Sequence, residues 1–214
     1  EYFNRVLQLG EKRENIFNVG SLGVENAKKI NLLLTTKTIK KFNLDLKKKI
    51  FVITLHPETL NNRNTKKNTQ ILLNALKKFK NTNFIFTMPN AESGYKEICN
   101  QIIKFCKKYK DSFFFKSLGQ DNYFAICKHA HCIIGNSSSG IIESPSLLTP
   151  SLDIGNRQLG RVRAESVINS RFNVKSIIKS IKECIKLKNT KKKYSKFKNP
   201  YEKNKTADRI IKVL

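Results

Sequence analysis

The sequence predicts an α/β protein built on a doubly wound, Rossmann-like parallel sheet. Short apolar runs of strand type alternate with longer segments in which apolar residues recur every three or four positions. Gly, Pro, Asn and Asp stand at the joints between these runs. Repeated strand–helix–strand units imply right-handed crossovers, and therefore parallel strands that are covered by helices on both faces. A chain of 214 residues, 39% of them hydrophobic, is long enough to bury such a core.

The apolar runs define the expected elements in order. Strands are predicted at 15–20, 50–56, 83–89, 112–118, 131–136, 150–155 and 166–169. The apolar residues between Ile71 and Phe79 share one helical face, and residues 95–109 carry a second such stripe. Residues 1–10 have a helical pattern, and the last fourteen residues predict a separate amphipathic helix.

The charge of the chain is strongly basic, with a formal net charge of +26. Such a charge raises nucleic acid or an anionic membrane as a partner. Of the 42 basic residues, however, 34 are scattered lysines, and no nucleic-acid recognition motif accompanies them, so no dedicated nucleic-acid binding is predicted. No apolar run is long enough to span a membrane, and the first residues lack the pattern of a signal peptide. We expect a cytoplasmic protein without membrane association.

The five cysteines are an odd number in a lysine-rich chain, which favours reduced thiols over a disulfide framework. The segment "CKHAHC" (127–132) offers two Cys and two His as metal ligands in principle. Its ligands are too close in sequence to surround a tetrahedral ion without help, and the segment leads into an apolar strand. The favoured interpretation is therefore that it lines the core, and no metal or cofactor is predicted.

Polar and small residues follow the predicted strands at the points where ligands bind in doubly wound sheets, beyond the carboxyl ends. These groups are Gly20–Ser21, His56–Glu58, Pro89–Asn90, Ser117–Gly119, Asn136–Gly140 and Gly155–Arg157. Each group alone is also typical of an ordinary turn. Together they predict a binding crevice at one rim of the sheet.

The segment "GNSSSG" (135–140) passes from a strand into a predicted helix, which points free backbone N–H groups at whatever lies above. Hydroxyls of Ser137 and Ser138 add donors for phosphate oxygens, and Gly140 allows close approach. The alternative is that one serine caps the helix. Glu143 follows within the first turns of that helix, where it accepts hydrogen bonds from ribose hydroxyls or, alternatively, only adds favourable charge near the helix N-terminus.

Two basic side chains complete the predicted rim. Arg157 can form bidentate hydrogen bonds with a diphosphate, and Arg161 and Arg163 are close to it in the sequence. The alternative is that these arginines form a group of surface ion pairs. His56 is a candidate diphosphate donor or general acid, with a plain turn residue before proline as the alternative. Neither a Walker motif nor a G-x-G-x-x-G fingerprint is present, so an ATP or NAD site of the usual kind is not indicated.

Several motifs in the right order identify a resemblance. The segments "VITLHPET" (52–59), "FIFTMPNAESG" (84–94), "SLGQDNY" (117–123) and "IIGNSSSGIIESPSLLTPSLDIGNRQLGR" (133–161) resemble the hydrolysing branch of the UDP-N-acetylglucosamine 2-epimerase family. The resemblance covers about residues 1–170. It implies the C-terminal domain of a glycosyltransferase-B-type two-domain fold. The expected division is 1–20 as linker and remnant of the N-terminal domain, 21–198 as the nucleotide-binding domain, and 199–214 as a helix that packs back toward the N-terminal domain.

Position by position, the resemblance implies that a set of six residues holds the UDP moiety, with His56 also a catalytic candidate. The set is His56, Asn90, Ser137, Ser138, Glu143 and Arg157. The reaction implied is elimination of UDP from UDP-N-acetylglucosamine or a 2,4-diacetamido analogue, followed by hydration of the glycal to the manno sugar, as in sialic acid biosynthesis.

The carboxylates that transfer protons in this family lie in its N-terminal domain. We therefore expect this chain alone to bind UDP without turning over substrate, and the full-length protein to be a homo-oligomer. A sugar transferase of the same fold and an inactive nucleotide-binding remnant remain the alternative interpretations.

Overall fold

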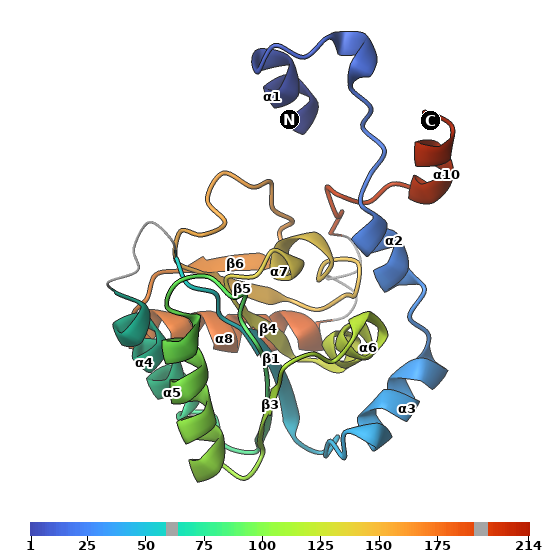
Figure 1. Cartoon of the computed structure of the whole chain (residues 1–214). Helices are drawn as coiled ribbons and strands as arrows, with labels where there is room; N and C mark the ends of the chain where they lie inside the picture. Colours follow the sequence, from blue (N-terminus) through green and yellow to red (C-terminus); the bar gives the residue numbers. More distant parts are fainter. Residues whose placement is uncertain (59–63, 191–196) are drawn as a thin grey trace.

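A computed structural model describes residues 1–58, 64–190 and 197–214 (Figure 1). Six parallel strands form one sheet in the order β3-β2-β1-β4-β5-β6. The strands are β1 (Lys49–Thr54), β2 (Thr82–Thr87), β3 (Ser112–Phe115), β4 (Cys132–Gly135), β5 (Ser151–Ile154) and β6 (Val167–Ser170). This order is that of a doubly wound dinucleotide-binding sheet, so the predicted fold class is confirmed.

Helices cover both faces of the sheet (Figure 1). The described helices are α1 (Tyr2–Gln8), the 3-10 helix η1 (Arg13–Asn15), α2 (Leu22–Lys28), α3 (Leu32–Lys41), α4 (Thr65–Leu76), α5 (Tyr95–Lys108), α6 (Gln120–His129), α7 (Ser139–Ile142), α8 (Val174–Asn189) and α10 (Thr206–Ile211). Of these, α1 and α10 lie away from the sheet (Figure 1). The side chains of Ser21, Asn31 and Asn173 accept N–H hydrogens from the first turns of α2, α3 and α8. These N-caps explain why the three helices begin where they do.

Two hydrophobic cores lie on opposite faces of the sheet, and β1 supplies both. Phe51 and Ile53 face the core formed with α4, α5 and α8, whereas Ile50 and Val52 face the core formed with α3 and α6. The alternation follows from the two-residue period of a strand. Because parallel strands are covered on both sides, both sets are apolar and the strand reads as one continuous hydrophobic run.

The cysteines of "CKHAHC" do not converge. Cys132 lies in the first core and Cys127 in the second, on the other side of the sheet. Burial raises the pKa of the Cys127 thiol well above its usual range, so this thiol stays protonated. The core-lining interpretation is therefore confirmed for the two cysteines, whereas His129 and His131 are only half-buried.

The strand predicted at 15–20 is wrong. The segment begins at the end of η1 and continues as extended chain outside the sheet, and the side chain of Phe17 is 53% exposed. Its apolar residues Ile16, Phe17 and Val19 fit a strand locally, but none of the described strands pairs with it. Instead its end pairs with the C-terminal segment, where Ser21 donates its backbone N–H to the carbonyl of Tyr201 over 3.1 Å.

The two ends of the chain lie on the same side of the sheet (Figure 1). The helix predicted at the N-terminus is confirmed as α1, whereas the predicted C-terminal helix is shorter than its fourteen residues and spans only α10. Helix α10 contacts α2, and Ala207 donates its backbone N–H to Glu25 Oε2 over 3.1 Å. That α10 also packs toward a further domain stays a prediction, as do the domain boundaries. In the described part of the chain, none of the helices combines the length and apolar character needed to cross a membrane.

Candidate functional site

A cleft of about 570 Å³ opens beyond the carboxyl ends of the strands. The loops after five strands line it, as the doubly wound fold predicts. The last residues of β1 and β2, Thr54 and Thr87, belong to the lining. The loops contribute His56 after β1, Asn90 after β2, Lys116–Gln120 after β3, Ser137–Ser139 and Glu143 after β4, and Arg157, Gln158 and Arg161 after β5. All six site residues predicted from the sequence therefore line one cleft.

The boundary between β1 and β4 is the point where the chain switches direction across the sheet, because β2 and β3 lie on one side and β5 and β6 on the other. Buried Asn136 joins the two loops at this point. The His56 backbone N–H donates to Asn136 Oδ1 over 2.7 Å, and Asn136 Nδ2 donates to the His56 carbonyl over 3.0 Å. These two hydrogen bonds tie the loop after β1 to the loop after β4.

His56 is held as a neutral hydrogen-bond donor. Its Nδ1 accepts the backbone N–H of Asn90 over 3.0 Å, so the ring hydrogen of the neutral imidazole is on Nε2. Burial, reinforced by the Arg157 guanidinium, lowers the pKa of His56 to about 4, against an opposing contribution from Glu92. At neutral pH this favours the donor interpretation over the general-acid one, because a general acid with so low a pKa is almost entirely deprotonated.

The serine loop presents unused donors to the cleft. Among the described residues, the backbone N–H groups of Ser137, Ser138 and Ser139 have no backbone acceptor. Helix α7 begins at Ser139, and the side chain of its N-cap residue, Ser138, makes no capping hydrogen bond. The capping alternative is therefore not realised, while three consecutive N–H groups lie beside the cleft, as an anion requires.

Glu143 lies just beyond the end of α7, which is only four residues long. The sequence predicts this residue within the first turns of the helix that follows the serine loop. Its position at the C-terminal end removes the alternative in which Glu143 stabilises a helix N-terminus. Burial raises the pKa of the Glu143 carboxyl, and Arg161 opposes that effect. Glu143 is half-buried and lines the cleft.

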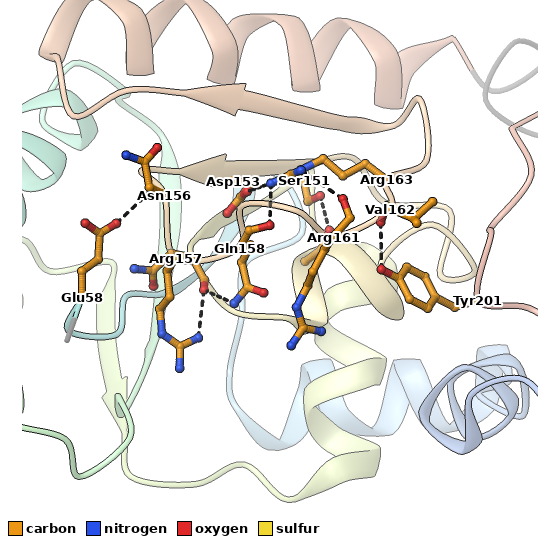
Figure 2. A network of polar contacts seen from close by, with 12 residues as sticks. Glu58, Ser151, Asp153, Asn156, Arg157, Gln158, Arg161, Val162, Arg163 and Tyr201 are labelled. Atoms are coloured by element: carbon orange, nitrogen blue, oxygen red, sulfur yellow. Dashed lines mark hydrogen bonds and ion pairs between the residues drawn. The ribbon is translucent and has the colours of Figure 1, made fainter. Parts of the chain in front are cut away.

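The three arginines after β5 separate into two groups (Figure 2). Arg157 and Arg161 extend to the same side and line the cleft. Arg163 instead lies along β5, where its Nη2 is 2.9 Å from Asp153 Oδ2. Only Arg157 and Arg161 therefore lie together at the cleft. Ion pairs are formed by Arg163, with Asp153, and by Arg157, with Glu92.

Two residues that the sequence did not single out hold this part of the site in place. Glu92 Oε1 lies 3.2 Å from Arg157 Nη2, and Gln158 Nε2 donates to the Asn136 carbonyl over 2.8 Å. Glu92 could have been noticed because it follows a predicted strand by only a few positions. Its pairing with a side chain 65 positions away could not.

Comparison with protein families matches residues 1–214 to the family described as UDP-N-acetylglucosamine 2-epimerase. The chain belongs to this family. Among curated relatives, it is 42% identical over 182 residues to the Escherichia coli polysialic acid biosynthesis protein P7, covering 85% of this chain and 46% of that protein. It is also 42% identical over 175 residues to a Campylobacter jejuni GDP/UDP-N,N'-diacetylbacillosamine 2-epimerase (hydrolyzing), covering 80% of this chain and 45% of that protein.

The 2-epimerase resemblance predicted from the motifs is therefore confirmed, and the chain spans about half the length of these relatives. Solved structures agree on the fold. A Staphylococcus aureus MnaA–UDP structure superposes with a TM-score of 0.71 at 15% identity, over 98% of this chain and 56% of that one. The structure of the Neisseria meningitidis UDP-GlcNAc 2-epimerase bound to UDP-GlcNAc superposes with a TM-score of 0.66 at 17% identity. The superposition covers 99% of this chain and 57% of that one.

Proposed function

We propose that this chain is the UDP-binding half of a hydrolysing UDP-N-acetylglucosamine 2-epimerase. The observation that carries the proposal is the donor set of the cleft. The Nε2 hydrogen of a neutral His56, the free backbone N–H groups of the serine loop and the Arg157 guanidinium all belong to one rim. Fixed donors of this kind suit a diphosphate that gains charge as it leaves.

The other predicted residues are each assigned a role in the site. Ser137 and Ser138 bind the diphosphate, Glu143 accepts hydrogen bonds from the ribose hydroxyls, and Asn90 holds His56 through its backbone. No metal or other cofactor takes part in this assignment. The ligand class agrees with relatives whose names include UDP-GlcNAc and UDP- or GDP-linked diacetamido sugars.

The proposed reaction is an elimination followed by hydration. A base removes the proton from C2 of the sugar, the C2–H electron pair forms the C1=C2 bond, and the C1–O bond breaks with its electrons on the departing UDP. Water then adds across the double bond, with oxygen on C1 and the proton on the opposite face of C2, giving the manno sugar. His56, Arg157 and the serine loop stabilise the leaving diphosphate.

Proton transfer at C2 is assigned to groups outside this chain. Among the described residues that line the cleft, Glu143 alone carries a carboxyl group, and it is assigned to the ribose. The 214-residue chain is therefore expected to bind UDP and to release none from UDP-N-acetylglucosamine. UDP release by the chain alone, followed with a coupled assay, would contradict this part of the proposal.

Calorimetric titration of the chain with UDP and UMP tests the binding assignment. UDP should bind at least about tenfold more tightly than UMP, because charge-assisted hydrogen bonds to the second phosphate contribute about 1.5–3 kcal/mol each. Arg157→Ala should remove most of that difference, whereas Arg171→Ala, at an exposed arginine outside the cleft, should leave it unchanged. Equal affinities of the unaltered chain for UDP and UMP would contradict a diphosphate site.

A further inference from the structure

The first turn of α2 lies against the carboxyl group of Glu143. A Cβ atom built on Gly23 would lie 2.5 Å from Glu143 Oε1, 3.3 Å from its Cδ and 3.5 Å from its Cγ. A real Cβ does not approach an oxygen so closely. The carboxyl group can therefore occupy its position only because residue 23 has no side chain.

The backbone offers no other reason for a glycine at this position. Gly23 is the second residue of α2, a right-handed helix, and is not among the residues with positive φ. Glycine is less favourable than alanine in a helix interior. The presence of a glycine at position 23 is therefore explained by the space that the Glu143 side chain occupies beside it.

The backbone around Glu143 is fixed from other directions. Ser144 Oγ donates to the Gly140 carbonyl over 2.7 Å, and Asn199 Nδ2 donates to the Ile142 carbonyl over 2.8 Å. With the backbone held in this way, the position of the carboxyl group depends on the side chain of Glu143 and on the surface that it meets. Ser139 and Arg161 act on the carboxyl group within the cleft. The helix at Gly23 is the surface that limits where its Oε1 can lie.

Helix α2 is itself held by the C-terminal segment. Ser21 donates its backbone N–H to the Tyr201 carbonyl over 3.1 Å, and Glu25 Oε2 accepts the backbone N–H of Ala207 over 3.1 Å. These bonds flank Gly23 on both sides along the helix. The surface facing Glu143 is therefore a fixed wall.

We propose that Gly23 is a positioning residue for ribose recognition. This inference rests on the proposed function, in which Glu143 binds the ribose of a nucleoside diphosphate. The absent side chain lets the Glu143 carboxylate stand where both vicinal hydroxyls of a ribonucleotide reach it. Alanine at position 23 displaces the carboxylate and leaves the diphosphate donors of the cleft in place.

Titration of the 214-residue chain with UDP and 2'-deoxy-UDP tests the inference. The unaltered chain should prefer UDP by about tenfold, since a hydroxyl hydrogen bond to a charged group is lost in the deoxynucleotide. Gly23→Ala should weaken UDP binding by about tenfold and reduce the preference to within about twofold. Its melting temperature should stay level or rise, because alanine favours the helix.

Three variants separate the possible outcomes. Leu22→Ala, at a 49% exposed side chain in the same turn, should keep both affinities. If Glu143→Gln keeps the preference for UDP, the assignment of Glu143 in the proposed function fails. If Glu143→Gln loses the preference but Gly23→Ala keeps it, only the role of Gly23 fails. A strongly lowered melting temperature of Gly23→Ala would show that glycine serves helix packing, and that result also overturns the inference.

Discussion

The Nδ1 atom of His56 accepts the backbone N–H of Asn90 across 3.0 Å, which joins the loop after β1 to the loop after β2. The bond requires a lone pair on Nδ1, so protonation of the imidazole breaks it. Binding geometry and charge state are therefore linked at this residue, and both can be followed by changing the pH.

The stability of the chain should fall as the pH drops from 6.5 to 4, in part because of His56. The pKa of His56 is lowered from 6.5 to about 4 in the folded chain, so within this window the unfolded chain takes up a proton that the folded chain does not. The loss is about 2 kcal/mol after allowance for solvent screening. Urea unfolding at pH 7 and pH 4 measures it.

His56→Gln is the matched control, since a glutamine amide can accept from Asn90 and donate to the cleft without titrating. The stability advantage of the unaltered chain over His56→Gln should shrink between pH 7 and pH 4 by about 2 kcal/mol. Parallel pH dependence of the two proteins would show that His56 does not have the lowered pKa. The comparison also cancels the contribution of His129 and His131, whose pKa values are lowered by burial as well.

Arg163→Ala should destabilise the chain more at pH 8 than at pH 5. Asp153 is 4% exposed, and Arg163 lies 2.9 Å from it. Burial raises the pKa of Asp153 and Arg163 opposes the rise, so removal of the guanidinium raises this pKa further. At pH 8 the carboxylate is left buried and unpaired, which costs about 3 kcal/mol. At pH 5 protonation relieves part of that cost.

Urea unfolding at the two pH values checks this expectation. The double variant Asp153→Asn/Arg163→Ala has no buried charge, so it should be more stable at pH 8 than Arg163→Ala alone, with little difference between the two pH values. A pH-independent loss in Arg163→Ala would instead assign the effect to the lost hydrogen bond from Arg163 to the Gln158 carbonyl.

Most strands of the sheet could be predicted from local sequence, because each buried strand coincides with a separate run of apolar residues. The strand predicted at 15–20 is wrong, because Ile16, Phe17 and Val19 give the same local pattern but have no partner among the described strands. Whether a strand pairs depends on residues far away in the sequence, so a short apolar segment alone does not determine it.

The site was predictable to the extent that it depends on strand ends. The doubly wound fold brings all carboxyl ends to one rim, so His56, Asn90 and Arg157 could be placed together from their positions alone. Side-chain pairing could not be derived in this way. One signal was available at Asp153, because a carboxylate inside a buried strand requires a partner, and Arg163 supplies it.

Gly135→Ala should destabilise the fold by about 3 kcal/mol or more, because it combines backbone strain with overpacking. Gly135 has φ +137°, and a Cβ there would meet the backbone of Thr54 on the adjacent strand β1. Gly160→Ala is the matched control, since Gly160 also has a positive φ of +82° but open space around its Cβ position. That variant should lose only about 1 kcal/mol. Equal losses in urea unfolding would rule out the close approach of β1 and β4 as the cause.

Glu92→Gln should strengthen UDP binding by about threefold to tenfold, a gain typical of removing one nearby like charge. The Glu92 carboxylate lies 3.2 Å from Arg157 Nη2. It therefore competes with the diphosphate for the guanidinium group that is proposed to bind the phosphates. Its negative charge also repels the phosphates. Glutamine keeps the shape and a hydrogen-bond acceptor for Asn90 Nδ2, which Glu92 binds over 3.3 Å. Calorimetric titration at low and high salt measures the gain, which should shrink as salt screens the charges. Weaker UDP binding in Glu92→Gln would mean that the ion pair instead holds Arg157 in its binding orientation.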